Sequence, residues 1–115
     1  MKNNRYALQK HEEEFSCPAE ALASLLGKKW VPQIIEQLVD SPKRFGELHH
    51  FLPEASPKML KQQLTLLEDN LLLTNNKTVN GNMVESTYTL SPKGLSLAPI
   101  VFQMKEWGQK ELICH

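Results

Sequence analysis

The stretch KRFGELHHFLPEASPKMLKQQLTLLEDNLLL, residues 43–73, decides the fold of this chain. It predicts two short amphipathic helices joined by a tight turn at Pro53, and the second helix begins after the cap residue Ser56. In that second helix, leucines recur at three- and four-residue intervals, which predicts a buried stripe. The stripe consists of Leu60, Leu64, Leu67 and Leu71.

The face opposite these leucines carries short polar and basic side chains. A DNA major groove admits one helix, and its base edges offer donors and acceptors to Ser, Thr, Gln and Lys. Residues near the start of a recognition helix reach those edges. We therefore predict DNA binding by Ser56, Lys58, Lys61, Gln62 and Thr65. Gln62 suits adenine, Lys61 suits guanine or a phosphate, and Ser56 with the first helical N–H groups suits a phosphate.

Turn and cap signals predict further elements on both sides of this pair. Helices are expected at about 18–27, after the cap position Cys17, and at about 30–40. The recognition helix is expected to run to about residue 70, and residues 1–15 form a helix or a partly ordered arm. Two β-rich runs, 71–79 and 83–90, flank Asn80-Gly81-Asn82, which is a strong hairpin signal. The expected fold is mainly α with a small β-hairpin wing (α+β), a winged helix-turn-helix in one domain, residues 1–115.

A long helix predicted at about 91–112 has two apolar stripes. One is Leu95, Ala98 and Phe102; the other is Leu97, Ile100, Val101, Met104 and Trp107. One face can cover the domain's own core, and the second is expected to bury against a partner subunit. The alternative is that both stripes form one wide face that is buried in the domain's own core. The N-terminal part (about 1–27) and the C-terminal helix (about 91–113) are therefore the predicted dimer interface, with Leu22, Leu97, Val101, Met104 and Trp107 as contacts.

The composition is that of an ordinary globular domain, with 115 residues, 41% apolar and 23% charged. The net charge of zero weighs against strong non-specific binding to nucleic acid, which depends on phosphate neutralisation. Basic residues gather in the middle of the chain, where Lys43, Arg44 and Lys77 are expected to hold the DNA backbone. No apolar run approaches a membrane span and no signal segment precedes the domain, so a cytoplasmic location is expected.

Two cysteines and two adjacent histidines are the side chains of this sequence best suited to redox or metal chemistry. Cys17 lies at a helix start, where unpaired N–H groups favour a thiolate although Glu20 opposes it, so Cys17 is a candidate redox or electrophile sensor. Alternatively Cys17 is a packing residue and Cys114 a thiol without a role. His49 and His50 diverge by about 100° on a helix and cannot readily share a metal. Metal-site spacing and phosphate loops are absent from the sequence, which indicates no cofactor and no enzyme activity.

The chain resembles the HxlR-type winged helix-turn-helix transcription regulators, relatives of the MarR-like group. The resemblance rests on CPAEALASLLGKKW, PKRFGELHHFLPEASPKMLKQQLTLLEDNLL, YTLSPKG and LAPIVFQMKEWG, in that order, over residues 17–108. It implies a homodimer that reads a two-fold-related DNA operator and regulates transcription in a prokaryotic cytoplasm. Some regulators of this kind pair a cysteine at this place with one of the other subunit, which would be Cys114 here. The wing departs from the pattern, since its tip lacks Pro and Lys77 is its one basic residue.

Two other functions remain open from the sequence. The exposed Lys/Gln face could dock an acidic protein partner, because a neutral net charge is no handicap there. Alternatively, a small apolar effector could bind between the subunits and replace the thiol as the input signal.

Overall fold

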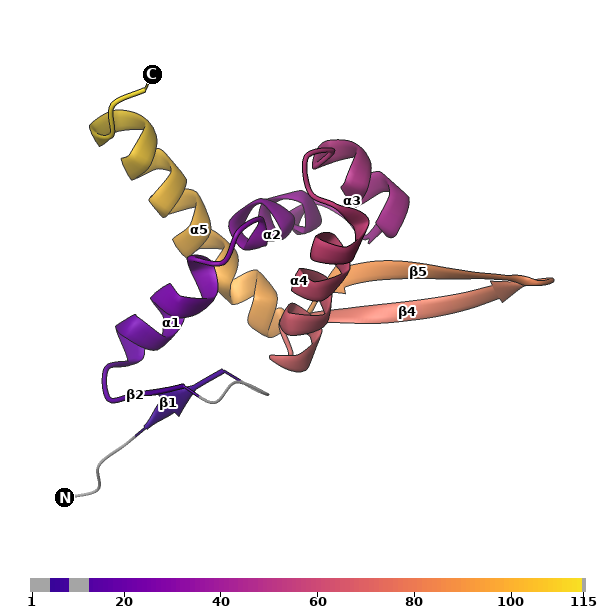
Figure 1. Cartoon of the computed structure of the whole chain (residues 1–115), viewed down its shortest axis with the longest axis horizontal. Helices are drawn as coiled ribbons and strands as arrows, with labels where there is room; N and C mark the ends of the chain where they lie inside the picture. Colours follow the sequence, from indigo (N-terminus) through magenta and orange to yellow (C-terminus); the bar gives the residue numbers. More distant parts are fainter. Residues whose placement is uncertain (1–4, 9–12, 115) are drawn as a thin grey trace.

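The recognition helix packs beside a two-stranded wing that extends well beyond the helices (Figure 1). The computed structural model describes residues 5–8 and 13–114. Helices are α1 (Pro18–Leu26), α2 (Val31–Val39), α3 (Phe45–Phe51), α4 (Pro57–Asp69) and α5 (Pro92–Glu111). Strands are β1 (Tyr6–Ala7), β2 (Glu14–Phe15), β3 (Lys43–Arg44), β4 (Leu73–Asn80) and β5 (Met83–Leu90). This arrangement confirms the predicted winged helix-turn-helix.

The helix ends follow from local capping chemistry. The Met59 N–H donates to Ser56 Oγ at 3.1 Å, and the Gly94 N–H donates to Ser91 Oγ at 3.1 Å. Each cap is followed by a proline at the first helical position, where the missing N–H costs little. Cys17 occupies the N-cap position of α1, although its side chain makes no capping hydrogen bond.

The wing is a regular antiparallel hairpin. Its register runs from Leu73↔Leu90 to Asn80↔Met83, so Asn80 is the last paired residue, and the loop is Gly81-Asn82. Gly81 has a φ of 62°, the left-handed conformation that two-residue hairpin loops require. The strand β3 pairs with β5 and gives a three-stranded sheet in the order β3-β5-β4.

The described part of residues 1–15 is extended, so the helix that was one of the two predictions for this segment is wrong there. Tyr6 pairs with Phe15 and Ala7 with Glu14 in a short antiparallel ladder. Residues 1–4 and 9–12 lie outside the described residues. Tyr and Phe favour extended backbone, and this segment is too short to form a helix that would outweigh that preference.

The leucine stripe of α4 forms the centre of the core. Leu60, Leu64 and Leu67 are completely buried. The prediction for Leu71 is wrong, because its side chain is 67% exposed. The helix ends at Asp69 and Leu71 takes a φ of 62°, so the helical periodicity stops and Leu72 is buried instead.

The helix α5 separates into a buried and an exposed apolar face. Leu97 and Val101 are 7% and 2% exposed and pack in the chain's own core. Their assignment as dimer contacts is therefore wrong, since nearly all of their surface is already buried in the chain's own core. Exposed apolar side chains lie on both sides of this buried face. Ile100, Met104 and Trp107 form one group, the exposed apolar face, and Leu95 and Phe102 lie on the other side. Pro99 lies inside α5, which continues through it.

None of the helices in the described residues is long and apolar enough to cross a membrane.

Hydrogen bonds tie the start of α5 to residues 70–72, which connect α4 to the wing. Ser91 Oγ donates to the Leu71 carbonyl at 2.6 Å, and the Ser91 N–H donates to the Leu72 carbonyl at 3.0 Å. Lys93 Nζ donates to the Asn70 carbonyl, also at 3.0 Å. Gly94 allows this approach, because a Cβ there would overlap the Leu72 carbonyl oxygen.

Gly94→Ala should therefore destabilise the protein by about 2–3 kcal/mol, despite the better helix propensity of alanine. Urea unfolding followed by circular dichroism measures this change. Gly46→Ala is the matched control, because a Cβ at Gly46 meets nothing within 4 Å and should change stability by less than about 1 kcal/mol. Equal stability of both variants would contradict the close contact at Gly94.

Candidate nucleic-acid interface

The first half of α4 presents its polar residues on one exposed face. Burial of the leucines fixes the rotation of the helix about its axis, so the residues three and four positions apart on the other side face solvent. The predicted set Ser56, Lys58, Lys61, Gln62 and Thr65 is exposed throughout. The structure thus brings these five candidate residues together on one surface.

Ser56 has two possible roles at the helix start. Its hydroxyl oxygen already accepts the Met59 N–H as the cap. Its own O–H proton remains available as a donor. Ser56 and the first N–H groups of α4 can therefore hold an anion while the cap stays intact.

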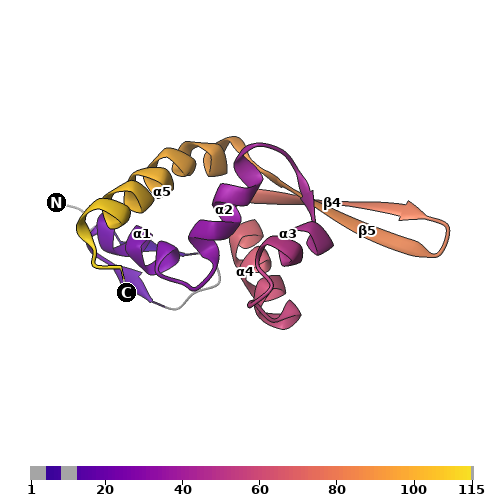
Figure 2. The same ribbon diagram turned by 90° about the horizontal axis from the view of Figure 1, so that it is seen from above.

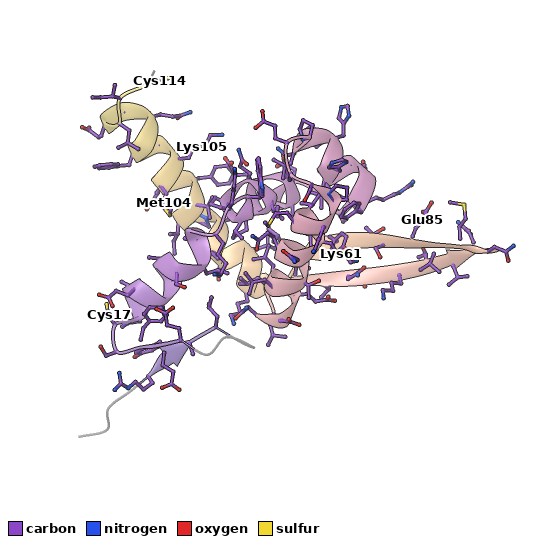
Figure 3. All side chains as sticks on the ribbon, in the orientation of Figure 1. Cys17, Lys61, Glu85, Met104, Lys105 and Cys114 are labelled. Carbon is purple, nitrogen blue, oxygen red and sulfur yellow. The ribbon has the colours of Figure 1, made fainter. Side chains whose placement is uncertain are left out.

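Lys61 is linked to the wing, which the sequence did not indicate. Lys61 Nζ donates to the Tyr88 hydroxyl at 3.0 Å and lies 5.8 Å from the centre of the Tyr88 ring. Figure 3 shows Lys61 where α4 meets the wing. An ammonium group has three donors, so Lys61 keeps two for a base or a phosphate. The contact joins residues 27 positions apart, beyond the reach of any local pattern.

The backbone candidates lie around the base of the wing. Lys43 and Arg44 form β3, where they pair with Tyr88 and Thr87. Lys43 Nζ donates to Ser41 Oγ at 2.8 Å, and Arg44 lies 3.9 Å from a carboxylate oxygen of Glu85. Such surface contacts contribute little stability, so both cations can turn to a phosphate at low cost. Lys77 is exposed further out on β4.

His49 has a structural role that the sequence analysis missed. Its Nε2 lies 3.1 Å from the Ala55 carbonyl oxygen, as a donor to it, and its ring stacks on Phe45 with centroids 6.3 Å apart. This contact fixes α3 to the turn that leads into α4. The spacing of Phe45 and His49, four residues on one helix, was the available signal. Within the described residues, no group of three or more metal-binding side chains occurs.

The two cysteines are separated within one chain. Cys17 is partly buried at the start of α1, and Cys114 is exposed beyond the end of α5. Figure 3 shows them at opposite ends of the α1–α5 region. Formation of a disulfide between them therefore requires two copies of the chain.

Two hollows lie along α1 and α5. The first, about 280 Å³, is lined by Leu8 on the N-terminal side, by Leu22 and Leu25 of α1, and by Leu97 of α5 among others. The second, about 300 Å³, lies against the small residues of α1 and the exposed Met104. Leu22 and Ile100 line both, so both hollows border the exposed apolar face of α5.

The family of HxlR-like helix-turn-helix proteins matches residues 25–114, which include α2 to α5 and the wing. The chain belongs to the HxlR family. It is 38% identical over 95 residues to the HTH-type transcriptional regulator YodB of Bacillus subtilis (strain 168), covering 82% of this chain and 84% of YodB. HxlR-family membership makes it a DNA-binding transcription regulator and not an enzyme.

Solved structures agree with this fold. The redox regulator HypR in its reduced form has a TM-score of 0.76 at 32% identity, covering 82% of this chain and 92% of HypR. The quinone-bound form of YodB has a TM-score of 0.68 at 37% identity, covering 82% of this chain and 99% of YodB. The relatives of this HxlR-family protein thus include regulators described by redox state and by a bound quinone.

The Lys61–Tyr88 contact should be measurable in a double-mutant cycle. Lys61→Met, Tyr88→Phe and the double variant should give a coupling energy of about 0.5–1.5 kcal/mol in urea unfolding, because each single change removes the same hydrogen bond. Additive effects of the two single changes would mean that Lys61 and Tyr88 do not form this hydrogen bond in solution.

Proposed function

We propose that this HxlR-family regulator acts in the cytoplasm as a homodimer on a two-fold-related operator, and that a thiol controls its binding. One observation carries the DNA part of the proposal. The leucines of α4 are completely buried, while the five polar candidates on its other side are exposed. A helix held in this way can enter a major groove without rearrangement.

The roles proposed for the interface residues follow from their chemistry. Gln62 reads adenine, and Lys61 reads guanine or holds a phosphate. Lys58 and Thr65 contact base edges or phosphates beside them. Ser56 binds a phosphate at the helix start. Lys43, Arg44 and Lys77 hold the backbone and carry no sequence information.

The homodimer is supported by the exposed apolar face of α5. Met104 and Trp107 are 47% and 62% exposed, and Leu22 of α1 lies partly buried beside this face. Burial of such a surface against a second copy is favourable. In a two-fold dimer, the half-sites are expected about one helical turn apart, roughly 10 bp, or a multiple of it.

Thiol control is supported by the redox and quinone descriptions of two relatives and by the positions of the two cysteines. HypR is described as a redox regulator and YodB was solved with a bound quinone. Cys17 and Cys114 lie at the ends of the two helices proposed for the dimer interface. A disulfide between Cys17 of one copy and Cys114 of the other would constrain that interface, and an electrophile would act on Cys17 alone.

A small apolar effector is the second candidate signal. The hollows of about 280 and 300 Å³ beside Leu22 and Ile100 favour it, because both are lined mainly by apolar side chains. Such a ligand would act without either thiol. A regulator that still responds after both cysteines are replaced would support this candidate.

Gln62→Ala should reduce the preference for the operator over random DNA by about 1–3 kcal/mol, because a bidentate contact to a base is lost. Lys43→Ala should weaken binding to both DNAs equally, because phosphates are alike in every sequence. Anisotropy titrations on an operator selected from a random pool measure both effects. Gln63→Ala is the matched control, since this partly buried neighbour donates to Met59 Sδ and should leave the preference unchanged. Equal losses on both DNAs for Gln62→Ala would contradict its role.

Diamide treatment should give a band of twice the mass on a non-reducing gel, with diamide accepting the electrons and protons of the two thiols. Cys17→Ser and Cys114→Ser should each abolish this band, and dithiothreitol should reverse it. A monomeric band with unchanged DNA affinity would contradict thiol control. A change in affinity without a crosslink would assign the response to Cys17 alone.

A further inference from the structure

Tyr88 lies where the wing meets the recognition helix. It belongs to β5 and is 1% exposed, so its ring is held in the core. Its hydroxyl accepts a hydrogen bond from Lys61 Nζ at 3.0 Å, and the same ammonium group lies 5.8 Å from the centre of the ring. Figure 2 shows, as Figure 1 does, that α4 lies beside the base of the wing and away from its tip. A buried side chain of the wing thus determines where a charged group of α4 is held.

The strand register gives Tyr88 a second neighbour among the candidate DNA contacts. The strand β5 is the middle strand of its sheet, and Lys43 of β3 pairs directly with Tyr88. Directly paired residues project from the same face of a sheet. Tyr88 is therefore the cross-strand neighbour of Lys43 and the hydrogen-bond acceptor of Lys61. Its hydroxyl sets the position of a proposed base contact relative to a proposed phosphate contact.

A lysine without a partner is poorly suited to reading a base. Its ammonium group is a compact charge on a flexible stem, and any phosphate within reach can satisfy it. Fixing such a stem when DNA binds costs rotamer entropy. In this chain Tyr88 already holds Lys61 before DNA is present. The acceptor is a neutral hydroxyl, so the contact directs the ammonium group without neutralising its charge.

We propose that Tyr88 is a positioning residue that makes Lys61 a reader of guanine, an inference that rests on the proposed function and decides between its two roles for Lys61. One of the three ammonium donors goes to Tyr88, and two remain for the O6 and N7 acceptors of the base. Lys61 lies five positions after the cap Ser56, in the part of a recognition helix that reaches base edges. Tyr88 is buried and acts through Lys61, without touching DNA itself.

The test uses the whole chain in its reduced form and anisotropy titrations on the selected operator, on its single-base-pair variants and on random DNA. Tyr88→Phe removes the hydroxyl and keeps the ring in the core. We expect about fivefold weaker binding to the operator, unchanged binding to random DNA, and loss of preference at one G·C pair in each half-site. The slope of log affinity against log salt should stay the same, because no charge is removed.

Lys61→Met tests the residue through which Tyr88 acts. This variant should lose the preference at the same G·C pair. Its salt slope should fall by much less than the roughly 0.9 per subunit expected when a phosphate contact is lost. When Lys61→Met is already present, Tyr88→Phe should change DNA binding no further, because no ammonium group remains to be held.

Tyr6→Phe is the matched control. It removes the hydroxyl of the other tyrosine of the chain, which lies on β1 away from the wing (Figure 1), and should leave the base preference unchanged. Circular dichroism melting shows whether each variant is folded.

Three results would overturn the inference while the proposed function stands. Unchanged operator binding by Tyr88→Phe would mean that Lys61 needs no positioning. A loss spread over all base pairs, or one that persists in the Lys61→Met background, would mean that Tyr88 only stabilises the domain. A salt slope reduced by about 0.9 per subunit in Lys61→Met would mean that Lys61 binds a phosphate. If the parent chain bound no selected DNA, the proposed function and this inference would fail together.

Discussion

The burial of Leu60, Leu64 and Leu67 is the constraint on which the rest of the structure depends. Three completely buried leucines on one helix leave a single rotation about its axis. Rotation by even one residue would bring a lysine or glutamine into the core, where an unpaired polar group costs several kcal/mol. The surface offered to a ligand is therefore determined from inside the molecule, before any ligand arrives.

Sequence patterns predicted the elements whose periodicity and caps are local. The start of α4 at Ser56-Pro57 and the hairpin around Gly81 are such cases. Predictions failed where tertiary context decides. Leu71 continued the leucine repeat but lies past the helix end, and Leu97 and Val101 were assigned to a partner although the chain's own core takes them. The buried residues of α5 come from both predicted stripes, Ala98 from one and Leu97 and Val101 from the other, so neither stripe as predicted is the inward face.

The candidate site was predictable in its residues but not in its connections. The exposed set on α4 follows from the leucine repeat alone. The link from Lys61 to Tyr88 and the contact of His49 with Ala55 depend on how separate elements meet. The first contact holds α4 against the wing, and the second holds α3 against the turn that leads into α4. The candidate surface is therefore positioned by several elements and not by one helix alone.

The hydrogen bonds of Ser91 and Lys93 join the start of α5 to residues 70 and 71, which follow α4 directly. Gly94 lets the start of α5 approach the Leu72 carbonyl backbone to backbone, with no side chain between them. The direction in which α5 leaves the domain is therefore tied to the short segment that connects α4 to the wing.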